Sequence, residues 1–129
     1  ELGIGVGWLR EEFEAIGVPF ERRGQRTDEY IGALRNLWTN DNASYQGEFV
    51  KFKNMSCNPK PDQDPLPIII GGHSEYAARR AGRLGDGFFP ATGWTGDIEP
   101  LLDIVRKEAE TVGRDAQLIE ITTGLEPEN

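Results

Sequence analysis

The chain has 129 residues, with 22 acidic and 14 basic side chains, and its formal net charge is −8 at pH 7. This negative charge disfavours nucleic acid and anionic membranes as partners, so any phosphate has to be held locally by backbone amides or a few cations. The single cysteine, Cys57, and the single histidine, His73, exclude an intrachain disulfide, a cysteine metal cluster and a three-histidine metal site.

The first half of the chain predicts one buried strand, two helices and a hairpin. Residues 2–6 are apolar and interrupted by glycine, which is typical of a strand buried on both faces of a parallel sheet. A short helix is expected over residues 10–16, and a longer amphipathic helix from Thr27, its predicted N-cap, to about Trp38. Residues 44–52 have the pattern of a small hairpin, and a proline-rich connector follows it.

The second half alternates strands with amphipathic helices. Residues 66–72 predict the clearest buried strand, and Ser74 is placed to cap the helix that comes next. A third strand is expected to begin at residue 88, a helix to cover residues 98–112, and a last strand to cover residues 118–122. Such alternation predicts right-handed βαβ units and a parallel sheet, so the fold class is α/β.

No stretch of the chain approaches the roughly 20 apolar residues of a membrane span, and no signal-peptide pattern is recognisable at its start. We therefore expect a cytoplasmic protein whose partner is a small molecule.

Ligands of parallel α/β folds lie at the carboxyl ends of the strands, where helix N-termini present unpaired N–H groups. The segment Gly71-Gly72-His73-Ser74 combines close backbone approach, a hydroxyl group and a helix start, and it predicts a phosphate or carboxylate site. Alternatively, the glycines only turn the chain and Ser74 only caps its helix. His73 is a candidate general acid or anion ligand, against the simpler interpretation of a polar loop residue.

The first strand ends in a second glycine-rich segment, with Gly3, Gly5 and Gly7 at alternate positions. Their spacing is G-x-G-x-G, which differs from the G-x-G-x-x-G of dinucleotide-binding proteins, so a nicotinamide site is only weakly supported. One interpretation is that Gly5 and Gly7 leave the strand end bare for a flat ring, with Trp8 as a wall. The other is close packing of the backbone.

Taken together, these segments resemble the bacterial luciferase-like monooxygenases, and within them the oxidoreductases that use the deazaflavin coenzyme F420. Their order and spacing carry the resemblance, which extends over nearly the whole chain. The matching stretches are residues 2–13, 17–24, 29–38, 59–61, 69–73 and 80–88.

The family's fold is the TIM (β/α)8 barrel. The resemblance therefore implies that residues 1–129 form a single domain, a partial barrel with about four parallel strands and a small β-hairpin insertion. These strands would correspond to strands four to seven of the barrel, and the abrupt start of the chain on a strand agrees with this assignment. Half of the barrel would then lie outside the sequence.

The resemblance also assigns the cofactor to two strand ends and the substrate to a third. The residues expected to bind the cofactor are Val6, Gly7, Trp8, Gly71, Gly72, His73 and Ser74. The residues expected to face the substrate are Ala91 and Trp94. No catalytic residue and no metal ligand is assigned.

Two departures from the family pattern refine the hypothesis. F420-dependent sugar-phosphate dehydrogenases have an acidic residue in place of Trp8 and a lysine in place of Trp94, so an apolar or aromatic substrate is favoured over a phosphosugar. Luciferases grip the flavin phosphate with an arginine where this chain has Val6, which favours F420 over FMN.

The resemblance thus implies hydride transfer between a deazaflavin and an organic substrate. The alternatives are an FMN-dependent monooxygenase and a non-catalytic fragment of either enzyme. Because an open four-stranded sheet exposes apolar edges, we also expect self-association or pairing with the missing barrel half.

Overall fold

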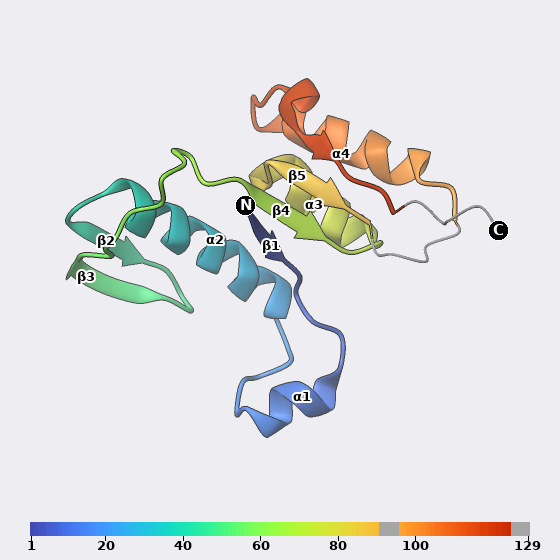
Figure 1. Ribbon diagram of the computed structural model, residues 1–129. Helices are drawn as coiled ribbons and strands as arrows, with labels where there is room; N and C mark the ends of the chain where they lie inside the picture. Colours follow the sequence, from blue (N-terminus) through green and yellow to red (C-terminus); the bar gives the residue numbers. More distant parts are fainter. Residues whose placement is uncertain (91–95, 125–129) are drawn as a thin grey trace. The chain divides into compact units, whose positions relative to one another are not determined.

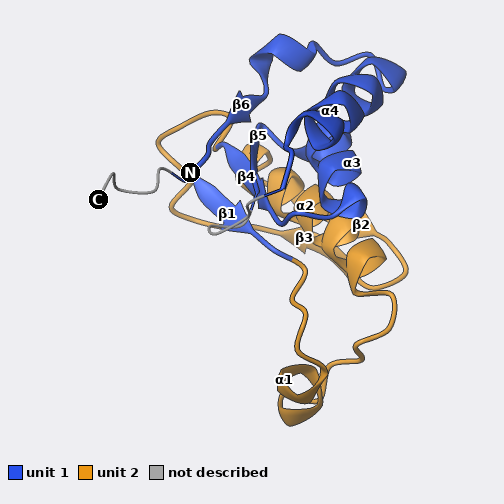
Figure 2. Ribbon diagram, turned by 90° about the vertical axis from the view of Figure 1, so that its right-hand side faces the viewer, with its two compact units in different colours: residues 1–5, 67–129 blue, residues 6–66 orange. Residues whose placement is uncertain are grey.

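The computed structural model describes residues 1–90 and 96–124. Its contacts divide the chain into two compact units, which Figure 2 shows in different colours. The first unit combines Glu1–Gly5 with Pro67–Asn129, and the second is Val6–Leu66. The expectation that residues 1–129 form a single domain stays a prediction, and each unit is described by itself.

The first unit is built on a parallel sheet of four strands, as the sequence predicts. The sheet order is β1 (Leu2–Ile4), β4 (Ile68–Gly71), β5 (Gly87–Phe89) and β6 (Glu120–Ile121), so consecutive strands of this unit are neighbours (Figure 1). All three pairings are parallel. The α/β class is therefore confirmed, and the carboxyl ends of all four strands lie at one edge of the sheet.

One face of this sheet is covered by α3 (Glu75–Leu84) and α4 (Glu99–Thr111). Ile68, Ile70 and Phe88 carry the core of this face, each with at most 1% of its surface exposed. Burying each of these side chains contributes roughly 2 kcal/mol. The helices supply small residues at their contact: a Cβ on Gly82 would stand 2.5 Å from the carbonyl oxygen of Val105. Here glycine permits close helix packing.

The opposite face of the sheet carries few side chains. Gly3, Ile69 and Gly87 are register partners across three strands, and Ile69 is only half-buried. A Cβ on Gly3 or Gly5 would meet no atom within 4 Å among the described residues. This face therefore presents backbone and few side chains.

A pair of charged residues joins α3, α4 and the sheet. Asp86 accepts a hydrogen bond from the Ile68 amide at 2.9 Å, and its own amide donates to the Ile68 carbonyl at 2.7 Å. Arg114, which follows α4, donates to the carbonyls of Gly82 at 2.8 Å and Gly85 at 2.6 Å. Its guanidinium lies 3.6 Å from the Asp86 carboxylate. Asp86 thus ties the turn after α3 to the start of β4.

The second unit contains α1 (Arg10–Ala15), α2 (Arg23–Thr39) and the antiparallel pair β2 (Ala43–Gln46) and β3 (Lys51–Met55). The predicted hairpin is therefore confirmed. The predicted N-cap is wrong: α2 begins at Arg23, and Thr27 lies inside it with its hydroxyl donating to the Arg23 carbonyl at 2.9 Å. A threonine hydroxyl can bond the preceding helical turn as well as cap a helix, and the sequence does not distinguish the two.

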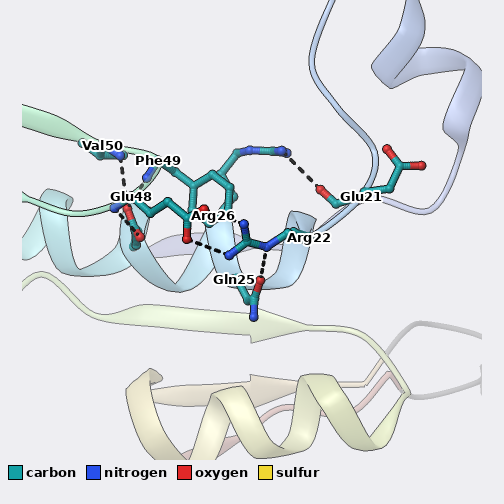
Figure 3. A network of polar contacts seen from close by, with 8 residues as sticks. Glu21, Arg22, Gln25, Arg26, Glu48, Phe49 and Val50 are labelled. Atoms are coloured by element: carbon teal, nitrogen blue, oxygen red, sulfur yellow. Dashed lines mark hydrogen bonds and ion pairs between the residues drawn. The ribbon is translucent and has the colours of Figure 1, made fainter.

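A carboxylate of α2 holds the turn of this hairpin. Glu29 accepts hydrogen bonds from the amides of Glu48 at 2.8 Å, Phe49 at 2.7 Å and Val50 at 3.1 Å. Figure 3 shows the turn residues Glu48, Phe49 and Val50 together with the adjoining pair of Arg22 and Glu48, whose Nη2 and Oε2 atoms are 2.7 Å apart. Burial raises the pKa of Glu29, but the hydrogen bonds from the three amides lower it by a larger amount. The pKa of Glu29 is therefore below the ordinary glutamate value. The hairpin is thus fastened to α2 through its turn.

The last predicted strand is shorter than expected. Residues 116–118 form a 3-10 turn, η1 (Ala116–Leu118), and only β6 pairs with the sheet.

Among the described residues, no helix combines the length and the apolar character needed to cross a bilayer.

Candidate functional site

The turn between β4 and α3 has the geometry that its sequence predicts. Gly72 has a φ of +127°, and a Cβ there would stand 3.1 Å from the Cβ of Ala77. Its amide donates to the Phe89 carbonyl at 3.0 Å, which ties the turn to the end of β5. Gly71 has ordinary φ, and a Cβ there would make only normal contacts. Of the two glycines, only Gly72 is required by the backbone.

Ser74 is the N-cap of α3. Its hydroxyl accepts a hydrogen bond from the Ala77 amide at 3.2 Å, and its carbonyl accepts one from the Ala78 amide at 3.0 Å. The capping interpretation is thus confirmed, and the hydroxyl is engaged with its own helix. In an α-helix the amides of the first turn have no intrahelical acceptor, so those of Glu75 and Tyr76 point out of the helix end.

Two exposed side chains flank this turn. His73 lies between Gly72 and Ser74 and is exposed. Glu75 opens the helix with a negative charge, and its carboxylate lies 3.6 Å from the guanidinium of Arg79. The turn therefore offers backbone dipoles, an imidazole and a bare glycine, a combination that accommodates a single anionic group.

The other predicted cofactor residues belong to the second unit. Val6 is half-buried and Trp8 is 81% exposed. Gly7 between them has a φ of +79°, and a Cβ there would lie 2.8 Å from the ring of Phe13. Gly7 therefore packs against the Phe13 ring of the same chain, in agreement with the earlier alternative of close packing of the backbone. Gly5, by contrast, borders open space within the described residues.

An aromatic and cationic cluster surrounds the Gly7 peptide, and we call it the Phe20 cluster. It consists of Arg10, Phe13, Phe20 and Arg23. Both guanidinium groups lie over the Phe20 ring, at 4.4 Å for Arg10 and 3.9 Å for Arg23. Phe13 meets the same ring edge-on, with a centroid distance of 5.3 Å. Sequence reasoning missed this cluster because contacts between separate turns leave no periodic signal.

An ion pair fastens the cluster to the next turn. Arg10 Nη1 donates to Glu21 Oε1 at 2.7 Å. This hydrogen bond lowers the pKa of the Glu21 carboxyl.

A cavity of about 270 Å³ lies at the end of α2, between Trp38 and the connector residues Pro61 and Pro65. Lys60 lines it, but its ammonium group donates to the carbonyls of Leu37 at 2.8 Å and Asn40 at 2.7 Å. Lys60 is therefore bound to the helix end, as expected for a cation near a helix C-terminus.

The structure leaves the remaining predicted site residues untested. Ala91 and Trp94, expected to face the substrate, lie in the segment that the structure does not describe, so they stay predictions. The two groups expected at the cofactor, residues 6–8 and 71–74, belong to different units, and only the arrangement within each group is known. Among residues 1–90 and 96–124, no cluster of histidine, cysteine or carboxylate side chains could hold a metal ion.

The profile of the luciferase-like monooxygenase family matches residues 1–127. An F420-dependent glucose-6-phosphate dehydrogenase of Segniliparus rotundus is 34% identical, over 98% of this chain and 40% of the relative. An FMNH2-dependent dimethylsulfone monooxygenase of Pseudomonas putida is 37% identical, over 91% of this chain and 33% of the relative. The chain thus spans between a third and two fifths of these relatives' length.

A solved structure of an F420-dependent secondary alcohol dehydrogenase in complex with an F420-acetone adduct superposes with a TM-score of 0.79. It is 20% identical, and the match covers 94% of this chain and 38% of that one. At this identity the similarity bears on the fold alone. It supports the α/β class and a parallel sheet equivalent to part of a TIM barrel.

Proposed function

The chain belongs to the luciferase-like monooxygenase family, and from this membership we propose that it forms part of an oxidoreductase that binds coenzyme F420. The family includes F420-dependent and FMN-dependent enzymes, and relatives of both kinds match more than nine tenths of this chain. The observation that carries the proposal is the turn of Gly72 and Ser74 before α3, a site for one anionic group at the carboxyl end of β4.

In this proposal the phosphate of the cofactor lies against the turn between β4 and α3. The outward-pointing amides at the start of α3 donate to its oxygens, and the positive φ of Gly72 shapes the backbone around them. His73 is exposed beside these amides and can add a further donor. When bound, the cofactor supplies the hydride chemistry, and the protein contributes binding and orientation.

Our proposal for the substrate is an apolar or aromatic organic molecule. Trp8 follows the end of β1 and is 81% exposed, so its indole is available for stacking. The resemblance to the F420-dependent sugar-phosphate dehydrogenases implies that those enzymes have an acidic side chain at that position. An indole carries no charge and donates only through its single ring N–H, so it offers a phosphosugar few polar contacts.

A second candidate is an FMN-dependent monooxygenase, because the dimethylsulfone monooxygenase is as similar to the chain as the F420-dependent relative. We favour F420 because Val6 stands where luciferases have the arginine that grips the flavin phosphate. Val6 is half-buried and can donate no side-chain hydrogen bond.

The test is a fluorescence titration with F420 and, in parallel, with FMN at fixed salt. Saturable binding of F420 alone supports the proposal, binding of FMN alone favours the monooxygenase, and binding of neither contradicts both for this chain.

The variant Gly72→Ala strains the turn and should weaken binding about tenfold, or roughly 1.4 kcal/mol. Gly113→Ala is the matched control, because Gly113 also has a positive φ, of +72°, but lies after α4. An equal loss of affinity in both variants would show that strain alone, and not the site, is responsible.

We also propose that the open β6 edge of the sheet is covered in the working protein, by the rest of a barrel or by a second copy. Leu118, which ends η1 just before β6, and Ile121 in β6 are exposed by 79% and 39%. Apolar side chains beside an open strand edge favour association. A monodisperse monomer by light scattering that binds no hydrophobic dye would refute this.

A further inference from the structure

Trp8 combines an exposed side chain with a fixed backbone. The indole is 81% exposed, although a tryptophan buries more apolar surface than any other side chain when it packs. The residue before it, Gly7, has a φ of +79° and lies against the ring of Phe13. The backbone that leads into Trp8 is therefore constrained, which is the arrangement expected of a side chain that anchors a ligand.

A closed ring of contacts holds that peptide. The carbonyl of Gly7 accepts a hydrogen bond from Arg23 Nε at 2.9 Å. Arg23 lies over the Phe20 ring at 3.9 Å, Phe20 meets Phe13 edge-on at 5.3 Å, and Phe13 lies against Gly7. Each member thus touches two others, so the carbonyl that precedes Trp8 has one defined orientation.

Arg23 is suited to this task by its chemistry. The guanidinium is planar, so it can stack on Phe20 with its flat face while its Nε–H donates in the plane to the Gly7 carbonyl. It is also the first residue of α2, a helix of 17 residues, so the hydrogen bond joins the Trp8 segment to a long regular element. Arg10, whose guanidinium also lies over Phe20 and pairs with Glu21, reinforces the same cluster.

We propose that Arg23 is a positioning residue that holds the Gly7 peptide so that Trp8 presents a fixed aromatic face to a planar ring. This inference rests on the proposed function. The ring can belong to the cofactor or to an aromatic substrate, and the shared chemistry is stacking on the indole.

The competing explanation is that Arg23 only helps to fold the Phe20 cluster. Arg22 offers a matched control, because it is the adjacent arginine, lies 4.8 Å from the Phe49 ring and pairs with Glu48, but is not bonded to Gly7. Both changes, Arg23→Met and Arg22→Met, remove one charge, one ring contact and at least one hydrogen bond.

The first measurement is the local motion of Trp8. In a protein that carries Trp38→Phe and Trp94→Phe, Trp8 is the only tryptophan, since the sequence has three. Time-resolved fluorescence anisotropy should show a larger nanosecond amplitude for Trp8 with Arg23→Met and no change with Arg22→Met. Equal anisotropy decays for the two variants would overturn the proposal. This readout needs no ligand.

The second measurement is ligand affinity, followed by the fluorescence of F420, FMN and 2-naphthol, the last being a flat ring without phosphate. Arg23→Met and Trp8→Ala should each weaken binding about tenfold, and the double variant should bind no more weakly than Trp8→Ala alone. Losses that multiply in the double variant would show that Arg23 acts independently of Trp8, which contradicts the proposal.

The ligands separate this inference from the proposed function. An effect on F420 or FMN alone assigns the stacked ring to the cofactor, and an effect on 2-naphthol assigns it to the substrate. If neither cofactor binds to the unmodified protein, the proposed function fails, while the anisotropy measurement still decides whether Arg23 positions Trp8.

Discussion

Replacing Arg114 with methionine tests whether the contact between α3, α4 and the sheet depends on one guanidinium group. Arg114 donates to the carbonyls of Gly82 and Gly85 at 2.8 and 2.6 Å, and 30% of its side chain is exposed. Methionine has a similar length but donates no hydrogen bond. The change leaves two carbonyls at the end of α3 without their charged donor.

A hydrogen bond to a charged group contributes about 1.5–3 kcal/mol. Because water reaches part of the Arg114 side chain and can replace some of the loss, we expect the two bonds together to contribute about 2–3 kcal/mol. For a domain of this size each kcal/mol shifts Tm by roughly 4 °C. Urea unfolding of Arg114→Met should therefore show a free energy lower by about 2–3 kcal/mol.

The matched control is Arg106→Met on α4. Arg106 is 52% exposed and pairs only with Asp103 and Glu99 of its own helix among the described residues. Such exposed pairs contribute about 0.5 kcal/mol. If Arg114→Met costs no more than Arg106→Met, the assignment of Arg114 as the link between the end of α3 and the segment after α4 is wrong.

Three further changes test other features by urea unfolding. Ser74→Ala should cost about 1 kcal/mol through the lost cap, and Ser74→Asp should retain most of the stability; equal losses would refute a capping role. Gly82→Ala should cost about 1–2 kcal/mol although alanine favours helices, because its Cβ would lie 2.5 Å from the Val105 carbonyl oxygen; a gain in stability would contradict that packing. The lowered pKa of Glu29 means that its contribution is complete at neutral pH and is lost as pH falls through the folded-state pKa, below the ordinary glutamate value. Glu29→Gln should therefore lose less stability on acidification than the unmodified protein. Parallel plots of unfolding free energy against pH for the two proteins would show that the Glu29 carboxylate does not hold the hairpin turn.

Local patterns were sufficient for much of the fold. The run of β-branched residues at Ile68, Ile69 and Ile70 predicted β4, because such a run between glycine and proline fits a buried strand. The apolar spacing of Leu101, Val105 and Ala109 predicted α4, and these three residues are buried. Ser74 was recognised as a cap because the required signal lies within three residues of the helix start.

The features that the sequence did not predict depend on contacts between distant residues. Arg114 reaches Gly82 across 32 positions, and no local rule connects a residue after one helix with the end of another. The start of α2 was misplaced because Arg23 has no capping signal before it: Arg22 is in the left-handed region and makes no side-chain cap. The choice between F420 and FMN depends on contacts with the bound cofactor, and the backbone geometry of the described residues does not determine these contacts.

The pairing of β1 with β4 has a consequence for the order in which the sheet forms. Leu2 pairs with Ile68, whereas Ile69 pairs with Gly87, so the first pairing closes a much longer loop than the second. The difference in loop-closure entropy amounts to about 1 kcal/mol. We expect β4 and β5 to associate first and β1 to join last and leave first. In amide hydrogen exchange Leu2 should then lose protection before Ile70, and this first strand becomes the place where the sheet opens.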